Sequence, residues 1–151
     1  MEKQRYTYIK NEEVIERAIA RNEVIVHYLN LLKQRHSDER IQLFLDEAVI
    51  LQKGVAEQLC HYLPNTPSSV LNTYSQYTNE DALKLKIPHA NNLDEIVDNL
   101  LALNNQLIDE FKPIAEKEGT EDAREAFSNL IELVEHNARQ ISMNAAGAMD
   151  V

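Results

Sequence analysis

Apolar residues recur at helical spacing in four stretches of the chain, which cover residues 11–36, 37–63, 92–118 and 120–146. Within each stretch they fall three or four positions apart and so line one face of a helix. In chain order, the four apolar stripes are Val14, Ala18, Ile25, Leu29 and Leu32; Ile41, Phe44, Ala48, Val55, Leu59 and Tyr62; Leu93, Val97, Leu100, Leu107 and Phe111; and Phe127, Leu130, Val134, Ala138, Ile141 and Ala145. The pattern predicts an all-α chain of four amphipathic helices.

Residues that favour helix ends stand between these stretches. Asn92 opens the third stretch as an N-cap with Glu95 three positions on, which is the arrangement of a capping box. Thr120 follows a glycine and suits the N-cap of the fourth helix. Pro64 is expected to end the second helix, and Pro113 predicts a kink or an early end in the third.

The first two stretches are separated by no glycine or proline, so one continuous helix has to be considered. At about 100° per residue, the two apolar stripes of an unbroken helix would point roughly a third of a turn apart. A tight turn over residues 35–38 removes this conflict. Ser37 is a suitable N-cap for the second helix, and Asp38 places an acid beside its positive end.

The connection between the second and third helices, residues 64–91, is much longer than the other two. It begins with PNTPSS and contains a short helical pattern over residues 80–86. A helix of about 25 residues is roughly 37 Å long, and this 28-residue connection can span it. We therefore expect one domain over residues 1–151, a four-helix bundle of the ferritin-like type with a long crossover at 64–91 and parallel second and third helices. The alternative is an up-down-up-down bundle with a bulky loop.

Ferritin-like di-metal proteins carry a glutamate on each of two helices and Glu-x-x-His on the other two, all facing inward. This chain lacks the Glu-x-x-His motif: Glu47 is followed three positions later by Ile50, and Glu132 by Glu135. Three Glu-x-x-x-His pairs are present instead, namely Glu23 and His27, Glu57 and His61, and Glu132 and His136. Each pair lies opposite its apolar stripe, so we expect solvated ion pairs, and a metal ion held there would need a partner subunit.

Amide side chains occupy the inward polar positions. One amide falls on or at the edge of each apolar stripe: Asn22, Gln52, Asn104 and Asn137. Their heights along the bundle nearly agree, since Asn22 lies 14 residues before the end of the first helix and Gln52 lies 15 after the start of the second. Asn104 and Asn137 match within about three residues, or roughly 4.5 Å of rise. The sequence thus predicts a polar layer of amides near the middle of the bundle.

The chemistry of this candidate layer differs from that of a metal centre. Amides are neutral and do not offset the charge of two divalent cations, so we expect neither a metal nor another cofactor. The layer is interpreted as a hydrogen-bonded device that fixes helix register. Two alternatives remain: a small polar ligand or water cluster bridged by the amides, and an unusual metal site that recruits Glu47, Glu110 and Glu135 from the stripe margins.

The charge and composition of the chain exclude some classes of binding partner. Fifteen basic residues against 25 acidic ones give a net charge of -10, which opposes binding to nucleic acid or an anionic membrane. There is no run of about 18 apolar residues and no apolar signal core after the polar N-terminus, so we expect a cytoplasmic protein. The single cysteine, Cys60, makes no internal disulfide and is expected to be a packed thiol.

The helix lengths, the crossover and the segment DERIQLFLDEAVILQKGVAEQL give the chain a resemblance to the ferritin-like superfamily over nearly its whole length. It is most similar to small bacterial rubrerythrin-related or uncharacterised bundles, which implies iron-dependent oxidase, peroxidase or hydroxylase chemistry. From the residues themselves, we expect a non-catalytic bundle that acts by self-association or by binding a protein partner, as a homo-oligomer with a dimer among the options. The alternatives are a di-metal oxidoreductase with atypical ligands and a carrier of a small polar ligand.

Overall fold

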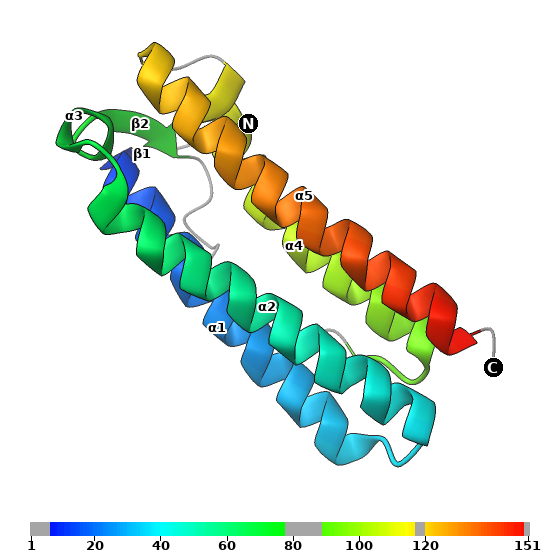
Figure 1. The fold of residues 1–151 in the computed structure, drawn as a ribbon. Coiled ribbons are helices and arrows are strands. Elements are labelled where there is room, and N and C mark those ends of the chain that lie inside the picture. The colour runs from blue at the N-terminus through cyan, green and yellow to red at the C-terminus, as the bar shows by residue number, and fades with distance from the viewer. Residues whose placement is uncertain (1–6, 78–88, 117–119, 150–151) are drawn as a thin grey trace, which may run out of the picture.

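Four long helices pack as a bundle in the computed structural model (Figure 1). The structure describes residues 7–77, 89–116 and 120–149. The long helices are α1 (Asn11–Arg35), α2 (Glu39–Asn65), α4 (Leu93–Glu116) and α5 (Glu121–Met149). The prediction of an all-α chain with four long helices is confirmed.

The chain connects the helices as two antiparallel pairs. A short turn joins α1 to α2, and α4 and α5 form the second pair (Figure 1). The start of α4 lies at the end of the bundle where α2 also starts, because the His36 ring nitrogen Nε2 lies 3.1 Å from the carbonyl oxygen of Ala90. Helices α2 and α4 therefore run parallel, as the long crossover predicted, and the alternative with a bulky loop at one end is wrong.

The core is made by the four apolar stripes. Every residue of the predicted stripes is buried or half-buried. Phe111 and Phe127 meet edge to face between α4 and α5, with ring centroids 5.7 Å apart. Helix α1 packs against α2 and α4, and α5 packs against the same two helices, so α2 and α4 lie diagonally across the bundle.

The turn between α1 and α2 differs from the prediction by one residue. Asp38, and not Ser37, is the N-cap: its Oδ1 accepts hydrogen bonds from the backbone N–H groups of Arg40 at 2.8 Å and Ile41 at 3.4 Å. The Gln42 side chain also donates to the backbone carbonyls of Lys33 and His36. These carbonyls belong to the end of α1, so one side chain of α2 helps to close the turn.

Neither Pro64 nor Pro113 is the last residue of its helix, so the predicted end at Pro64 and the early end considered at Pro113 are not found. Helix α2 includes Pro64 and ends at Asn65, and α4 continues past Pro113 to Glu116. At the end of α2, the Asn65 and Thr66 side chains donate to the carbonyls four residues earlier, at 2.7 and 2.6 Å. Side chains thus satisfy two of the terminal carbonyls of α2.

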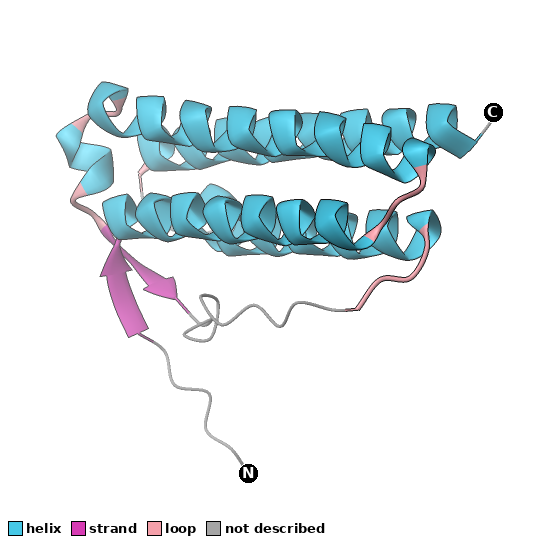
Figure 2. Ribbon diagram, turned by 90° about the horizontal axis from the view of Figure 1, so that it is seen from below, coloured by secondary structure: helices cyan, strands magenta, loops and turns pink. Residues whose placement is uncertain are grey.

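A small sheet at one end of the bundle was not predicted (Figure 2). Strand β1 (Thr7–Lys10) pairs antiparallel with β2 (Tyr74–Tyr77), and the short helix α3 (Ser68–Leu71) precedes β2. Asn11 joins these elements to α1, because its side chain donates to the Val70 carbonyl at 2.9 Å and accepts from the Ser75 hydroxyl. The short helix expected over residues 80–86 lies outside the described residues.

The N-cap assignment can be tested with one pair of substitutions. Asp38→Ala removes the side chain that accepts two backbone N–H groups and should lower the free energy of unfolding by about 1 kcal/mol. Ser37→Ala at the neighbouring exposed position is the matched control and should change it by less than about 0.5 kcal/mol. Urea denaturation followed by circular dichroism measures both, and the opposite ranking would assign the cap to Ser37.

Candidate functional site

The four predicted amides lie together in the middle of the bundle. Asn22, Gln52 and Asn104 are completely buried, and Asn137 is 4% exposed. Each comes from a different long helix, and each occupies a position on its inward face. We call these four residues the amide layer.

Gln52 is the central member of the amide layer. Its Nε2 donates to Oδ1 of Asn22 at 2.5 Å and to Oδ1 of Asn104 at 3.1 Å. Its Oε1 accepts from Nδ2 of Asn104 at 3.2 Å and from Nδ2 of Asn137 at 3.4 Å. One side chain from α2 is therefore bonded to all three other helices.

The other amides complete the network through one another and through their own helices. Nδ2 of Asn137 also lies 3.4 Å from Oδ1 of Asn104. Asn22 donates to the Ala18 carbonyl at 2.9 Å, and Asn104 donates to the Leu100 carbonyl at 3.0 Å. The polar groups of this layer thus bond to protein, which is the condition for burying them at low cost.

The amide layer is enclosed by apolar residues along the bundle axis. One turn away on either side, each helix presents a buried or half-buried apolar side chain. These are Ala18 and Ile25, Ala48 and Val55, Leu100 and Leu107, and Val134 and Ile141. A hydrogen bond in such a dry environment is stronger than one in water. Losing one of its partners therefore lowers the free energy of unfolding more than it would at the surface.

A buried ion pair accompanies the amide layer. The Arg21 guanidinium contacts the Glu110 carboxylate across α1 and α4, and their side chains are only 1% and 4% exposed. Sequence reasoning placed Glu110 at a stripe margin and overlooked Arg21. The spacing itself could have found both, since Arg21 lies three residues after Ala18 and Glu110 lies three residues after Leu107, on the buried faces.

A second polar contact links α1 and α4. The Tyr28 side chain is 2% exposed, and its hydroxyl accepts a hydrogen bond from Nδ2 of Asn99 at 3.4 Å. Desolvation by burial raises the pKa of Tyr28 above 10.0, and the hydrogen bond from Asn99 partly opposes this shift. The tyrosine is therefore a neutral hydroxyl at physiological pH.

The three carboxylates considered for an unusual metal site do not come together. Glu47 is exposed, Glu135 is half-buried with an Arg139 nitrogen 4.0 Å away, and Glu110 contacts Arg21. Within residues 7–77, 89–116 and 120–149, no three His, Cys, Asp or Glu side chains are grouped so that they could hold a metal ion.

The remaining predicted polar residues lie on the surface. All six side chains of the three Glu-x-x-x-His pairs are exposed, as the helical spacing indicated. Cys60 is also exposed, so the prediction of a packed thiol is wrong. It follows the fully buried Leu59, and one helical step of about 100° carries it out of the core.

Comparisons with protein-family models, curated proteins and solved structures gave no significant match. Within the described ranges, no helix combines the length and apolar character needed to cross a membrane. The chain is thus characterised by its four-helix bundle and its amide layer, and no family assignment follows.

Asn104→Leu tests whether the amide layer supports the fold. The variant removes hydrogen bonds to Gln52 and Asn137 and leaves their buried amides with fewer partners. The free energy of unfolding should therefore fall by about 3 kcal/mol. Chemical denaturation provides the measurement, with Asn105→Leu on the exposed face of α4 as the control. A layer built to receive a ligand would instead show a higher melting temperature for Asn104→Leu.

Proposed function

We propose that this chain is a non-catalytic, cytoplasmic bundle of the ferritin-like type that acts by associating with another protein chain. The amide layer is its structural centre, and its outer helix faces make the contacts. The observation that carries this proposal is the bonding of four buried amides to one another at the height where a di-metal protein would hold carboxylates.

The donor chemistry of the layer argues for a structural role. Two divalent cations require anionic ligands to offset their charge, and four neutral amides supply none. Glu110, the one buried carboxylate among the described residues, already contacts the cationic Arg21. Among the described residues, a cation in the layer would therefore find no buried carboxylate free of a positive partner.

The amide layer also has a physical role in fixing how the four helices align. If one helix slid by a full turn, its amide would leave the network and the buried apolar side chain one turn away would replace it. The abandoned amides would then lose their hydrogen bonds in a dry core, so the shifted packing is disfavoured. The layer thus stabilises one alignment of the four helices over its neighbours.

Surface charge supports a protein partner of a particular kind. With a net charge of -10, the chain attracts basic or mixed-charge surfaces and repels nucleic acid. An acidic bundle without a reactive centre can still display a rigid surface made by its helices. We therefore assign its activity to association, either with itself or with a partner that carries complementary charge.

Metal binding separates this proposal from an oxidoreductase. Purified protein, and protein dialysed against ferrous or manganous salts, should retain less than about one equivalent of metal per chain by elemental analysis. The variant His27→Ala, His61→Ala, His136→Ala removes the exposed imidazoles and serves as the control for weak surface binding. More than one equivalent of iron or manganese retained by that variant would contradict the proposal and favour the di-metal alternative.

A further inference from the structure

Helix α2 has an outward face whose side chains are mostly exposed to solvent. Its residues follow one another at alternating spacings of three and four, and together they form what we call the α2 seam. The seam consists of Arg40, Leu43, Glu47, Ile50, Gly54 and Glu57. Leu43 is 61% exposed and Ile50 is 70% exposed, so two large apolar side chains face solvent along it.

On the described parts of the long helices, the exposed large apolar side chains lie on or beside this seam, and the other two exposed ones, Tyr8 and Tyr74, lie on the small sheet. Of the large hydrophobic residues exposed on the four long helices within the described residues, two belong to the seam and the third is Met143 of α5, which is 67% exposed. Met143 and Leu43 line opposite sides of one groove between α2 and α5, with a volume of about 440 Å³. Apolar groups gathered at one place on an acidic surface are typical of an interaction site.

The spacing of the seam fits a coiled-coil contact with another helix. Alternating steps of three and four place residues at the a and d positions of a heptad repeat, where side chains of two helices interlock. When two copies of α2 meet antiparallel across a twofold axis, a positions face d positions. One register then pairs Arg40 with Glu57, Leu43 with Gly54, and Glu47 with Ile50 of the second copy, each pair occurring twice.

Charge and volume both favour this register. Arg40 faces the opposite charge of Glu57, and Leu43 lies over a glycine at which an added Cβ would meet no atom within 4 Å. The glycine therefore offers room for an apolar side chain. In a parallel arrangement, Arg40, Glu47 and Glu57 would each face their own copies, and like charges would repel.

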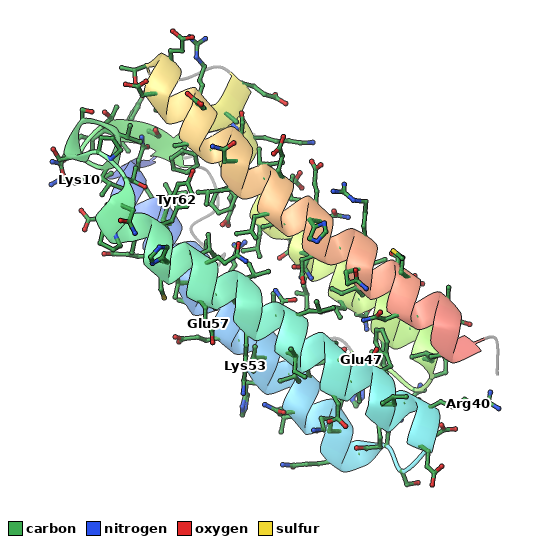
Figure 3. The ribbon with its side chains drawn as sticks, in the orientation of Figure 1. Lys10, Arg40, Glu47, Lys53, Glu57 and Tyr62 are labelled. Atoms are coloured by element: carbon green, nitrogen blue, oxygen red, sulfur yellow. The ribbon has the colours of Figure 1, made fainter. Side chains whose placement is uncertain are left out.

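The flank of the seam supplies a further complementary pair. Asp46 and Lys53 are both exposed, they are seven residues apart on the side of α2 nearest α1, and Asp46 already contacts Lys33. The antiparallel register brings Asp46 to within two residues, or roughly 3 Å of rise, of the level of Lys53 of the second copy. The same Lys53 lies one turn from Ile50 and can therefore approach Glu47 as well. Figure 3 shows Glu47, Lys53 and Glu57 along α2 and Arg40 near its start.

We propose that two copies of this chain form a symmetric dimer through an antiparallel contact between their α2 seams. This inference rests on the proposed function, because it specifies self-association as the form that association takes. Two chains of charge -10 repel at long range, so the contact depends on local pairs of opposite charge and on the apolar residues between them.

Sedimentation equilibrium of the full chain over a range of concentrations tests the proposal. Wild-type protein should dimerise, and Arg40→Glu should raise the dimer dissociation constant by roughly tenfold or more, because two ion pairs become repulsive. Ile50→Glu should have at least as large an effect. The controls are Lys112→Glu, with the same change of charge, and Ala102→Glu, both on exposed positions of the diagonal helix α4.

The double variant Arg40→Glu, Glu57→Arg tests the register, because it exchanges the two charges and should restore much of the lost affinity. Circular dichroism checks that each variant remains folded. A monomeric wild type at about 1 mM, a dimer insensitive to Arg40→Glu and Ile50→Glu, or no recovery in the double variant would each overturn the α2 contact. None of these results bears on metal retention, so the failure of this inference and the failure of a non-catalytic role can be distinguished.

Discussion

The bundle depends on the hydrogen bonds that Gln52 makes with the amides of the three other helices. Polar groups can be buried in an apolar core only where they find partners, and here each amide finds its partners on the neighbouring helices. This requirement couples all four helices at a single height, although the chain between α2 and α4 is long. Apolar packing alone would tolerate sliding more readily, since one aliphatic side chain replaces another at moderate cost.

Charged side chains are rare in the core of this bundle and common on its outer faces. The described core contains one pair of opposite ions, Arg21 and Glu110, and otherwise relies on neutral polar groups such as the amide layer and the Tyr28 hydroxyl. Ionic groups are concentrated on the outer faces, where the three glutamate–histidine pairs and the α2 seam lie. A bundle organised in this way is suited to presenting a fixed surface, which supports the proposal that it acts by association.

Much of the fold follows from the sequence because helical periodicity is a local property. The spacing of apolar residues located the four helices, and the length of the 64–91 connection indicated its crossover. Counting residues from the helix ends also found the amide layer.

The pairing of β1 with β2 was missed because it joins segments more than 60 residues apart, with only four residues in each strand. The contact between Arg21 and Glu110 was missed because Arg21 was overlooked and Glu110 was placed only at a stripe margin, although the spacing of both puts them on buried faces. The choice of Asp38 over Ser37 as the cap depends on where α1 stops, which periodicity locates only to within a residue or two.

Hydrogen exchange of the side-chain amides, followed by nuclear magnetic resonance, tests the amide layer most directly. The NH₂ protons of Gln52 and Asn104 are buried and bonded, whereas those of Asn105, the next residue on α4, are exposed and provide an internal reference. We expect the protons of Gln52 and Asn104 to exchange at least roughly a hundredfold more slowly than those of Asn105. Equal exchange rates at all three side chains would show that the amides are open to water, and the central claim would be contradicted.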